Sequence, residues 1–254
     1  MRRLLAFVVL TCAAFAQDER RVTSPNGRIE FRLFIATQTD SNLSRLAYEV
    51  FYQGKPLLKT SFMGLDIEAQ EPLLGENVGL TSSSSSKSSQ YNSLVAKYMQ
   101  NGSLGRLIDV EARAYDDGVA FRYVIPPSTP LMEMVILQEA TEFRFAQSIP
   151  HQSEPKELLD YALDSSIGFV PFTADEAVIY DVVPLNGAWV AITESKKHND
   201  PASHLIRSNP TTDFTRLDHP IPATAPLTFP WRIVSLGTAP ERAIKSAIIA
   251  DLSR

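Results

Sequence analysis

The residues with the most evident capacity for chemistry lie between positions 194 and 204, where a carboxylate and two imidazoles occur close together. Glu194, His198 and His204 are residue types that bind transition metals such as zinc. They fall in a stretch rich in proline and asparagine, and nothing in the sequence fixes their geometry. The pattern therefore favours solvated surface residues over a zinc site.

Two further histidines, His151 and His219, are candidates for acid–base chemistry. Interconversion of sugar anomers needs an acid and a base that face one sugar, commonly a histidine with a glutamate. Both histidines adjoin prolines in predicted loops, and no predicted strand presents such a pair. Mutarotase chemistry is therefore not indicated.

Serine and tryptophan offer no stronger candidates. Residues 82–89 are almost all serine, without a Gly-x-Ser-x-Gly turn or a histidine partner for a nucleophile. A segment that can bury so little apolar area is instead predicted to be a mobile loop. Trp189 and Trp231 could stack on a sugar ring, but each lies in an apolar stretch, which favours core packing.

The element that organises the chain is a β-hairpin predicted over Ile108–Pro126. With Asp117 and Gly118 as the central residues of a type I′ turn, Val110 lies opposite Ile125. The inward apolar face then consists of Val110, Ala112, Ala114, Phe121, Tyr123 and Ile125. Asp116 and Asp117 resemble a catalytic pair, but neighbouring turn residues point apart, so both are interpreted as structural.

Alternation of apolar and polar residues predicts further antiparallel strands on both sides of the hairpin. The predicted segments are 29–35, 46–52, 62–67, 91–99, 142–145, 178–183, 188–193 and 229–237. Residues 196–226 are rich in proline, asparagine and threonine and predict a long loop. The fold class is therefore all-β, a large two-sheet antiparallel β-sandwich with a short C-terminal helix.

That helix is predicted over Ala239–Leu252. Thr238 and Glu241 have the spacing of a capping box. Ile244, Ile248 and Leu252 lie along one stripe, which would either dock on the sandwich or stay exposed and promote association.

Residues 1–16 have the layout of a secretory signal peptide, with two arginines, an apolar core and an Ala-x-Ala cleavage site, so export is expected. Cys12, the single cysteine, is an alternative lipid-attachment site that Thr11 fits poorly. The net charge of −5 and the lack of a basic stripe argue against nucleic-acid binding. No later segment is long and apolar enough to span a bilayer.

Four segments together resemble the amino-terminal domain of glycoside hydrolase family 97. They are Tyr115–Tyr123, Thr141–Phe143, Val190–Glu194 and Pro230–Arg232, and they occur in the family's order between about Ser24 and the chain end. The resemblance implies a galactose-mutarotase-like supersandwich that, in exported bacterial α-glucosidases and α-galactosidases, precedes a (β/α)8 barrel. The chain ends where that barrel would begin, so we expect a β-sandwich domain at 17–237 and a linker helix at 238–254.

The resemblance also implies where the chemistry lies. The family's catalytic carboxylates stand on barrel loops, and its calcium ion is held mainly by barrel glutamates, with one glutamate supplied by the sandwich. That calcium-ligand role is carried over to Glu194 alone, although Lys196 and Lys197 depart from the family's sequence and disfavour a cation. No catalytic residue is expected here, and the chain alone is expected to be inactive.

Two functions from different classes remain open. The first is the non-catalytic sandwich of a secreted α-glycosidase whose barrel is encoded separately or lost, and the second is a stand-alone carbohydrate-binding module. The apolar stripe of the terminal helix favours the first, whereas exposed aromatic side chains would favour the second. The sugar, its linkage and the retaining or inverting outcome stay undetermined.

Overall fold

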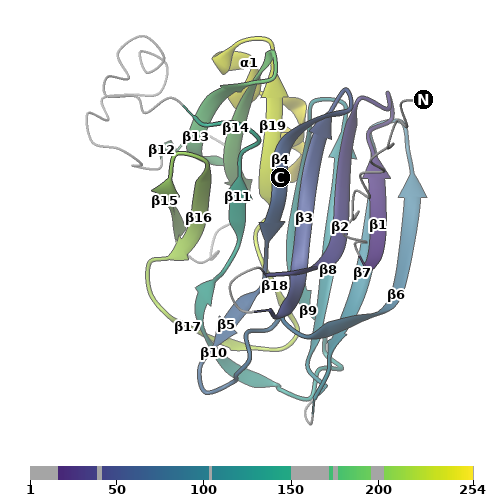
Figure 1. Ribbon diagram of the computed structural model, residues 1–254, viewed down its shortest axis with the longest axis vertical. Helices are drawn as coiled ribbons and strands as arrows, with labels where there is room; N and C mark the ends of the chain where they lie inside the picture. The colour runs from purple at the N-terminus through teal and green to yellow at the C-terminus, as the bar shows by residue number, and fades with distance from the viewer. Residues whose placement is uncertain are drawn as a thin grey trace, which may run out of the picture.

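The computed structural model describes residues 17–38, 42–102, 105–149, 172–173, 177–195 and 203–253. The predicted signal peptide, including Cys12, lies outside these ranges. The described chain forms two layers of antiparallel strands followed by two short helices (Figure 1). The predicted all-β sandwich is confirmed.

The first layer combines a four-stranded sheet in the order β1-β2-β3-β4 with a three-stranded sheet in the order β17-β10-β5. Isolated bridges through Leu74 and Glu76 connect the two. The strands are β1 (Gln17–Thr23), β2 (Ile29–Thr37), β3 (Ser44–Tyr52), β4 (Lys55–Phe62), β5 (Leu65–Ile67), β10 (Glu133–Glu139) and β17 (Ile221–Thr224).

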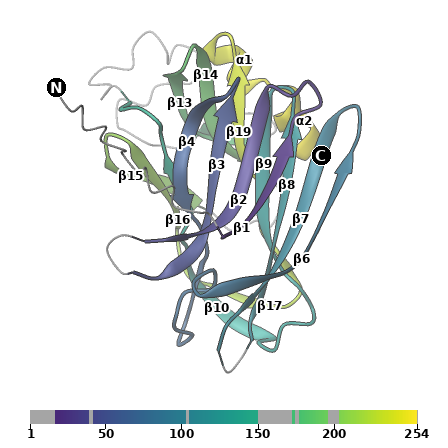
Figure 2. The ribbon, with the colours of Figure 1, turned by 45° about the vertical axis from the view of Figure 1, so that its right-hand side comes forward.

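The second layer is a nine-stranded sheet in the order β12-β13-β14-β19-β9-β8-β7-β6, with β18 paired to β9. Its middle strands β8 and β9 lie behind β1–β3 in both ribbon views, and β6 and β13 extend beyond the first layer on opposite sides (Figures 1 and 2). Its strands are β6 (Val78–Lys87), β7 (Tyr91–Gln100), β8 (Leu107–Tyr115), β9 (Gly118–Ile125), β12 (Phe172–Thr173), β13 (Ala177–Leu185), β14 (Ala188–Ser195), β18 (Leu227–Thr228) and β19 (Arg232–Gly237). A small third sheet contains β11 (Glu142–Arg144), β16 (Thr212–Leu217) and β15 (Ser203–Asn209).

The main core lies between the two layers. The ring of Phe121, from the second layer, contacts Phe31 and Tyr48 of the first layer at centroid distances of 5.6 and 4.6 Å. Offset aromatic packing of this kind stabilises a core beyond the area it buries. The hairpin face predicted to point inward is buried throughout: Val110, Ala112, Ala114, Phe121, Tyr123 and Ile125 are each at most 1% exposed.

The predicted hairpin register is wrong by two residues. Val110 lies opposite Tyr123 instead of Ile125, and the turn residues are Asp116 and Asp117. A shift of two keeps every side chain on its own face, so the inward set is unchanged. Neither aspartate has a positive φ, so the turn is not type I′.

Gly118 is required by the neighbouring strand. A Cβ at this position would lie 2.6 Å from the carbonyl oxygen of Val234 and 2.9 Å from the Cα of Ser235, both in β19. No real Cβ tolerates backbone atoms at such distances, so only glycine lets β9 and β19 pair this closely.

Asp116 and Asp117 hold two remote parts of the chain, which confirms their structural interpretation. Asp116 Oδ1 accepts a hydrogen bond from the Asn26 backbone N–H at 2.9 Å. Asp117 Oδ2 accepts hydrogen bonds from the N–H groups of Ala247 at 2.6 Å and Ile248 at 3.4 Å. The hairpin turn therefore anchors both the first turn of the domain and the final helix.

The serine-rich segment is a strand, so the predicted mobile loop at 82–89 is wrong. β6 pairs with β7 along most of its length, with Ser84 opposite Val95 and Ser86 opposite Ser93. Serine buries little apolar surface, but its backbone groups can still complete a ladder that the adjacent strand offers. The side chains from Thr81 to Lys87 remain exposed.

The predicted long loop at 196–226 is also wrong for its described part. Strands β15, β16 and β17 occupy much of residues 203–224, and Pro210 lies in the turn between β15 and β16. Pro210 and Pro226 therefore lie between short strands, whereas Pro222 lies within β17. Residues 196–202 lie outside the described ranges.

The C-terminal helix is divided into α1 (Pro240–Ile244) and α2 (Ala247–Leu252). The predicted capping box is not formed, because Ala239 is the N-cap of α1 and no side chain caps it. Ile244, Ile248 and Leu252 are 8%, 0% and 4% exposed and pack in a cluster with Trp231 and Ile233. The stripe thus docks on the sandwich and leaves no bare apolar face.

A pH-dependent contribution to stability is expected from Asp109 of β8. Burial raises the pKa of its carboxyl group above the ordinary value of about 3.9, and Lys97 Nζ at 3.8 Å only partly opposes this. The folded state therefore binds the proton more tightly than the unfolded state, and the wild type loses stability as the pH rises through this window.

We expect Asp109→Asn to remove that loss. Urea unfolding at about pH 4 and about pH 7 measures this. The free energy of unfolding of the variant, relative to that of the wild type, should be larger at the higher pH. Parallel pH profiles for the two proteins would contradict the prediction.

Candidate functional site

Glu194 is buried near the end of β14. Its Cα lies opposite that of Arg232 in β19, and the residue is 5% exposed. A glutamate at a strand end is usually solvated, whereas the Glu194 side chain is enclosed. A buried carboxylate must be compensated by a cation or by hydrogen bonds, which directs attention to its neighbours.

Arg232 is the compensating cation and is itself 1% exposed. Its Nε and Nη2 atoms donate to the two oxygens of Glu139 at 2.9 and 2.5 Å, a bidentate arrangement. Its Nη1 atom donates to Glu194 Oε2 and to Ser203 Oγ. Ser203 in turn donates to Glu194 Oε2 at 3.0 Å. These four residues, Arg232, Glu139, Glu194 and Ser203, form what we call the Arg232 cluster.

Hydrogen bonds continue from the Arg232 cluster across the core. The Thr141 hydroxyl donates to Glu139 Oε1 at 2.8 Å, so the Tyr123 hydroxyl, 2.6 Å from Thr141 Oγ1, is the donor in that contact. The Gly64 N–H donates to the Tyr123 oxygen at 3.0 Å. Burial, and then the nearby Glu139 carboxylate, raise the pKa of Tyr123, so the phenol keeps its proton.

The arrangement of charges limits the chemistry of the Arg232 cluster. Glycoside hydrolysis ordinarily uses two carboxyl groups that flank the scissile bond of a bound sugar. Glu139 and Glu194 are 0% and 5% exposed and share one guanidinium, so no sugar can reach the space between them. The Arg232 cluster therefore serves to hold side chains in place.

The described residues do not complete a calcium site. Calcium takes about six to eight oxygen ligands, whereas Glu194 is the single glutamate assigned to the ion here. Among the residues that the structure describes, no group of three or more His, Cys, Asp or Glu side chains could hold a metal ion. Both contacts of Glu194 with Arg232 and Ser203 use Oε2.

The predicted histidine candidates do not assemble with Glu194. His204 Nδ1 instead lies 2.7 Å from Asp218 Oδ1 at the surface, and His219 is exposed. His151 and His198 lie outside the described residues. The described chain therefore gives neither a zinc site nor an acid–base pair around a sugar.

The prediction of core packing is confirmed for Trp231, which is 3% exposed. The guanidinium groups of Arg113 and Arg122 lie 4.8 and 4.3 Å from its ring centroid. Trp189 is partly buried against the same cluster of side chains. The Trp231 ring, enclosed in the core, is therefore not available for stacking on a sugar.

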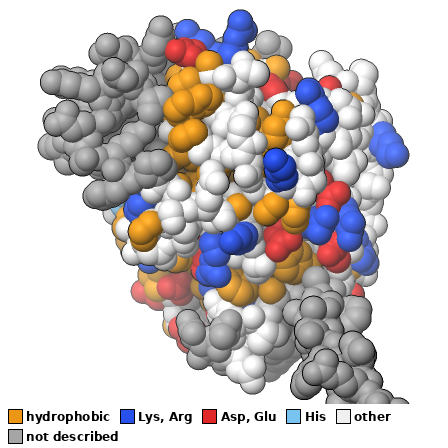
Figure 3. Space-filling model, turned by 45° about the horizontal axis from the view of Figure 1, so that its top comes forward, with side chains coloured by type: hydrophobic (Ala, Val, Ile, Leu, Met, Phe, Trp, Pro, Cys, Tyr) orange, Lys and Arg blue, Asp and Glu red, His pale blue; other side chains and the backbone are white. Residues whose placement is uncertain are grey.

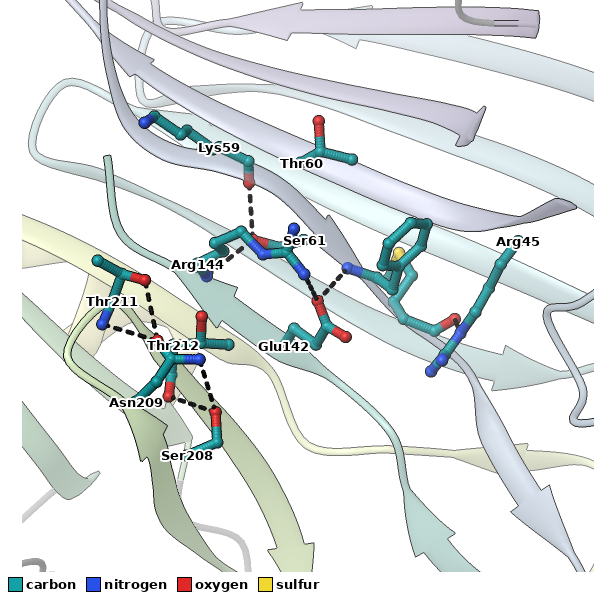
Figure 4. A network of polar contacts seen from close by, with 12 residues as sticks. Arg45, Lys59, Thr60, Ser61, Glu142, Arg144, Ser208, Asn209, Thr211 and Thr212 are labelled. Atoms are coloured by element: carbon teal, nitrogen blue, oxygen red, sulfur yellow. Dashed lines mark hydrogen bonds and ion pairs between the residues drawn. The ribbon is translucent and has the colours of Figure 1, made fainter. Parts of the chain in front are cut away.

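A second polar network, around Glu142 of β11, was not predicted from the sequence (Figure 4). Glu142 Oε2 accepts hydrogen bonds from the Phe62 N–H at 3.2 Å and from Arg144 Nη2 at 3.3 Å. Ser61 accepts from the Arg144 N–H at 2.9 Å and donates to the Lys59 carbonyl at 2.8 Å. This network joins the edge of β4 to the small third sheet.

The surface carries mixed charges. Figure 3 shows Lys and Arg side chains interspersed with Asp and Glu on one face, without a continuous basic stripe. Within the described ranges, no helix has the length and apolar character needed to cross a bilayer.

Residues 22–254 match the family model described as glycosyl-hydrolase 97 N-terminal. A retaining alpha-galactosidase of Bacteroides thetaiotaomicron is 24% identical, and the match covers 86% of this chain but 35% of that protein. A family 97 enzyme from Pseudoalteromonas sp. strain K8, solved with acarbose, has a TM-score of 0.67 and 17% identity over 92% of this chain and 38% of its own. A beta-arabinopyranosidase has a TM-score of 0.62 and 18% identity, over 87% of this chain and 40% of its own.

The chain therefore spans well under half the length of these relatives. The structural likenesses support the sandwich fold, and the family model covers the sandwich and both helices. This chain belongs to the glycosyl-hydrolase 97 N-terminal family.

Proposed function

We propose that this chain is the non-catalytic N-terminal sandwich of a secreted family 97 type α-glycosidase and shapes the active-site edge of a catalytic barrel that is not part of the chain. The observation that supports this most directly is the Arg232 cluster, because Glu194, the expected site residue, and its neighbour Glu139 are both buried and bound to Arg232. The names of the relatives, a galactosidase and an enzyme in complex with acarbose, support a carbohydrate as the substrate class of the assembled enzyme.

The finer part of the proposal concerns Glu194. We assign Glu194 Oε1 to a calcium ion that barrel glutamates would share, while Arg232 and Ser203 hold Oε2. A calcium ion would supply positive charge near the sugar's leaving group. Within this chain, the role of Glu194 is to present one oxygen in a fixed orientation.

Export through the signal peptide at residues 1–16 belongs to the same proposal, and it places the protein in the periplasm or outside a bacterial cell. The partners are then a carbohydrate and a family-type catalytic barrel.

A stand-alone carbohydrate-binding module is the second candidate. The buried stripe of Ile244, Ile248 and Leu252 favours it, since the described chain covers this stripe without a barrel. Calorimetric titration of the chain with α-gluco- and α-galacto-oligosaccharides discriminates the two, because a module binds them unaided.

The purified chain should neither hydrolyse aryl α-glucosides or α-galactosides nor bind calcium with submicromolar affinity. Adding a family barrel should restore both, and Glu194→Gln should then weaken calcium binding. The sandwich should stay folded in this variant, because Arg232 keeps Glu139 as a partner. Glu111→Gln, at the surface beside Arg122, is the matched control. Turnover above background by the chain alone would overturn the non-catalytic proposal.

A further inference from the structure

β6 is an edge strand with one open side. Among the described strands it pairs with β7 alone, so its other side presents backbone N–H and C=O groups to its surroundings. The strand is ten residues long, and both ribbon views place it at the outer margin of the second layer (Figures 1 and 2). Such an edge is a ready template for another strand.

The serine segment of β6 lacks the features that usually protect an edge. Natural edge strands carry charges, prolines or bulges that prevent pairing. Between Ser82 and Ser86 there is no charge and no proline, and the one register irregularity lies before it, between Leu80 and Ser82. Lys87 is the first charge, at the end of the strand. The backbone edge of the serine segment is thus open to pairing.

Serine also makes this edge compatible with reversible pairing. Side chains from Thr81 to Lys87 are exposed on both faces, so the strand offers no apolar surface that would drive irreversible aggregation. The Arg20 side chain, from β1, donates to the hydroxyl of Ser83 at 2.8 Å. That contact steadies the strand through a side chain and uses no backbone group of β6.

We propose that β6 pairs antiparallel with β6 of a second copy of this chain, about a two-fold axis through the serine run, so that two nine-stranded sheets join edge to edge. A two-fold interface uses the same surface twice and must be self-complementary. In registers centred on Ser83, Ser84 or Ser85, Lys87 faces an uncharged residue of the other copy. Hydroxyl groups can bond across the junction as Ser86 and Ser93 already do at 2.7 Å.

The expected association is weak and depends on concentration. One pair of strands buries less than the roughly 1,000 Å² that a stable interface needs. The serine edge also differs from the stripe of the terminal helices, which the sandwich already covers. An effect confined to substitutions in β6 therefore identifies the edge as the interface.

A cysteine scan tests the geometry. In a Cys12→Ser background, each serine from Ser82 to Ser86 is replaced in turn by cysteine and the protein is oxidised at high concentration. In a two-fold antiparallel pair only the residue on the axis faces its own copy, so disulfide-linked dimer should peak at one position and fall at both neighbours. Gln90→Cys, in the turn of the same hairpin, is the control and should not crosslink. Equal crosslinking at all positions, including Gln90, overturns the proposal.

Sedimentation velocity supplies an independent measurement. The wild type should form a reversible dimer as its concentration rises, and the Ser83→Lys/Ser85→Lys double variant should remain monomeric with an unchanged far-UV spectrum, because four lysines would meet at the junction. A wild type that stays monomeric at about millimolar concentration overturns the proposal, as does a dimer that the two lysines leave intact.

Discussion

Arg232→Met is expected to destabilise the sandwich by about 3–5 kcal/mol, the usual cost of removing one partner from a buried ion pair. Methionine fills a similar volume but leaves the carboxylates of Glu139 and Glu194 without their shared cation. Urea unfolding followed by circular dichroism measures the loss directly.

The charge balance of the Arg232 cluster predicts which of its variants lose the most stability. Glu139→Gln and Glu194→Gln each leave one carboxylate paired with Arg232, so each should cost less than Arg232→Met. Arg122→Met is the matched control, because Arg122 pairs with Glu111 at 2.7 Å but is partly exposed, where such pairs contribute about 1 kcal/mol or less. Equal losses for the two arginine variants would refute the buried-cation role.

Gly118→Ala is expected to cost about 3 kcal/mol. The added Cβ would stand 2.6 Å from the Val234 carbonyl oxygen, and backbone atoms of a paired strand cannot move aside as a flexible side chain can. Ladder contacts between β9 and β19 must therefore lengthen, which thermal unfolding should detect as a lower midpoint.

Gly79→Ala is the control for this substitution. Gly79 also lies in a strand, and a Cβ there meets only the Asn101 Oδ1 atom, at 3.9 Å. Its effect should stay within about 0.5 kcal/mol. If both substitutions cost the same, close strand packing at Gly118 is refuted as the cause, because the restriction of the unfolded chain by alanine stabilises the protein and cannot produce a loss.

The sequence was informative wherever a local period determined the structure. Alternation identified the inward face of the hairpin, because side-chain direction repeats every second residue whatever the register. It misplaced the pairing by two residues, because the position of Gly118 is fixed by its close contact with Val234 and Ser235, which lie in a strand more than a hundred residues later. No turn rule contains that information.

The serine strand shows how a distant contact can override local propensity. Composition alone made residues 82–89 a loop, but the ladder with β7 decides their conformation. The helix caps are a separate case: α1 begins at Ala239 without the predicted side-chain cap, and α2 receives hydrogen bonds from Asp117, which no local pattern near residue 247 could indicate.

The functional site was only half visible in the sequence. Glu194 came from a family resemblance, whereas Glu139 and Ser203 carried no signal. Arg232 did carry a signal in the sequence, because a charged residue inside the apolar run Trp231–Leu236 requires a buried counter-charge. The counter-charge could not be named, because it stands on β10, 93 residues away.

The two aspartates of the hairpin turn also constrain the order of folding. Asp116 closes onto Asn26 across 90 residues and Asp117 onto Ala247 across 130, so one turn joins the earliest and latest parts of the domain. Contacts between segments so far apart in sequence close slowly, since the intervening chain must first be ordered. During synthesis from the N-terminus, the contact between Asp116 and Asn26 can form first. The contact of Asp117 can form only after the later segment that contains Ala247 has been synthesised. A ribosome-bound chain that ends before Ala247 should therefore carry an assembled hairpin with an uncapped carboxylate, and the final helices should be the last elements to gain protection from hydrogen exchange.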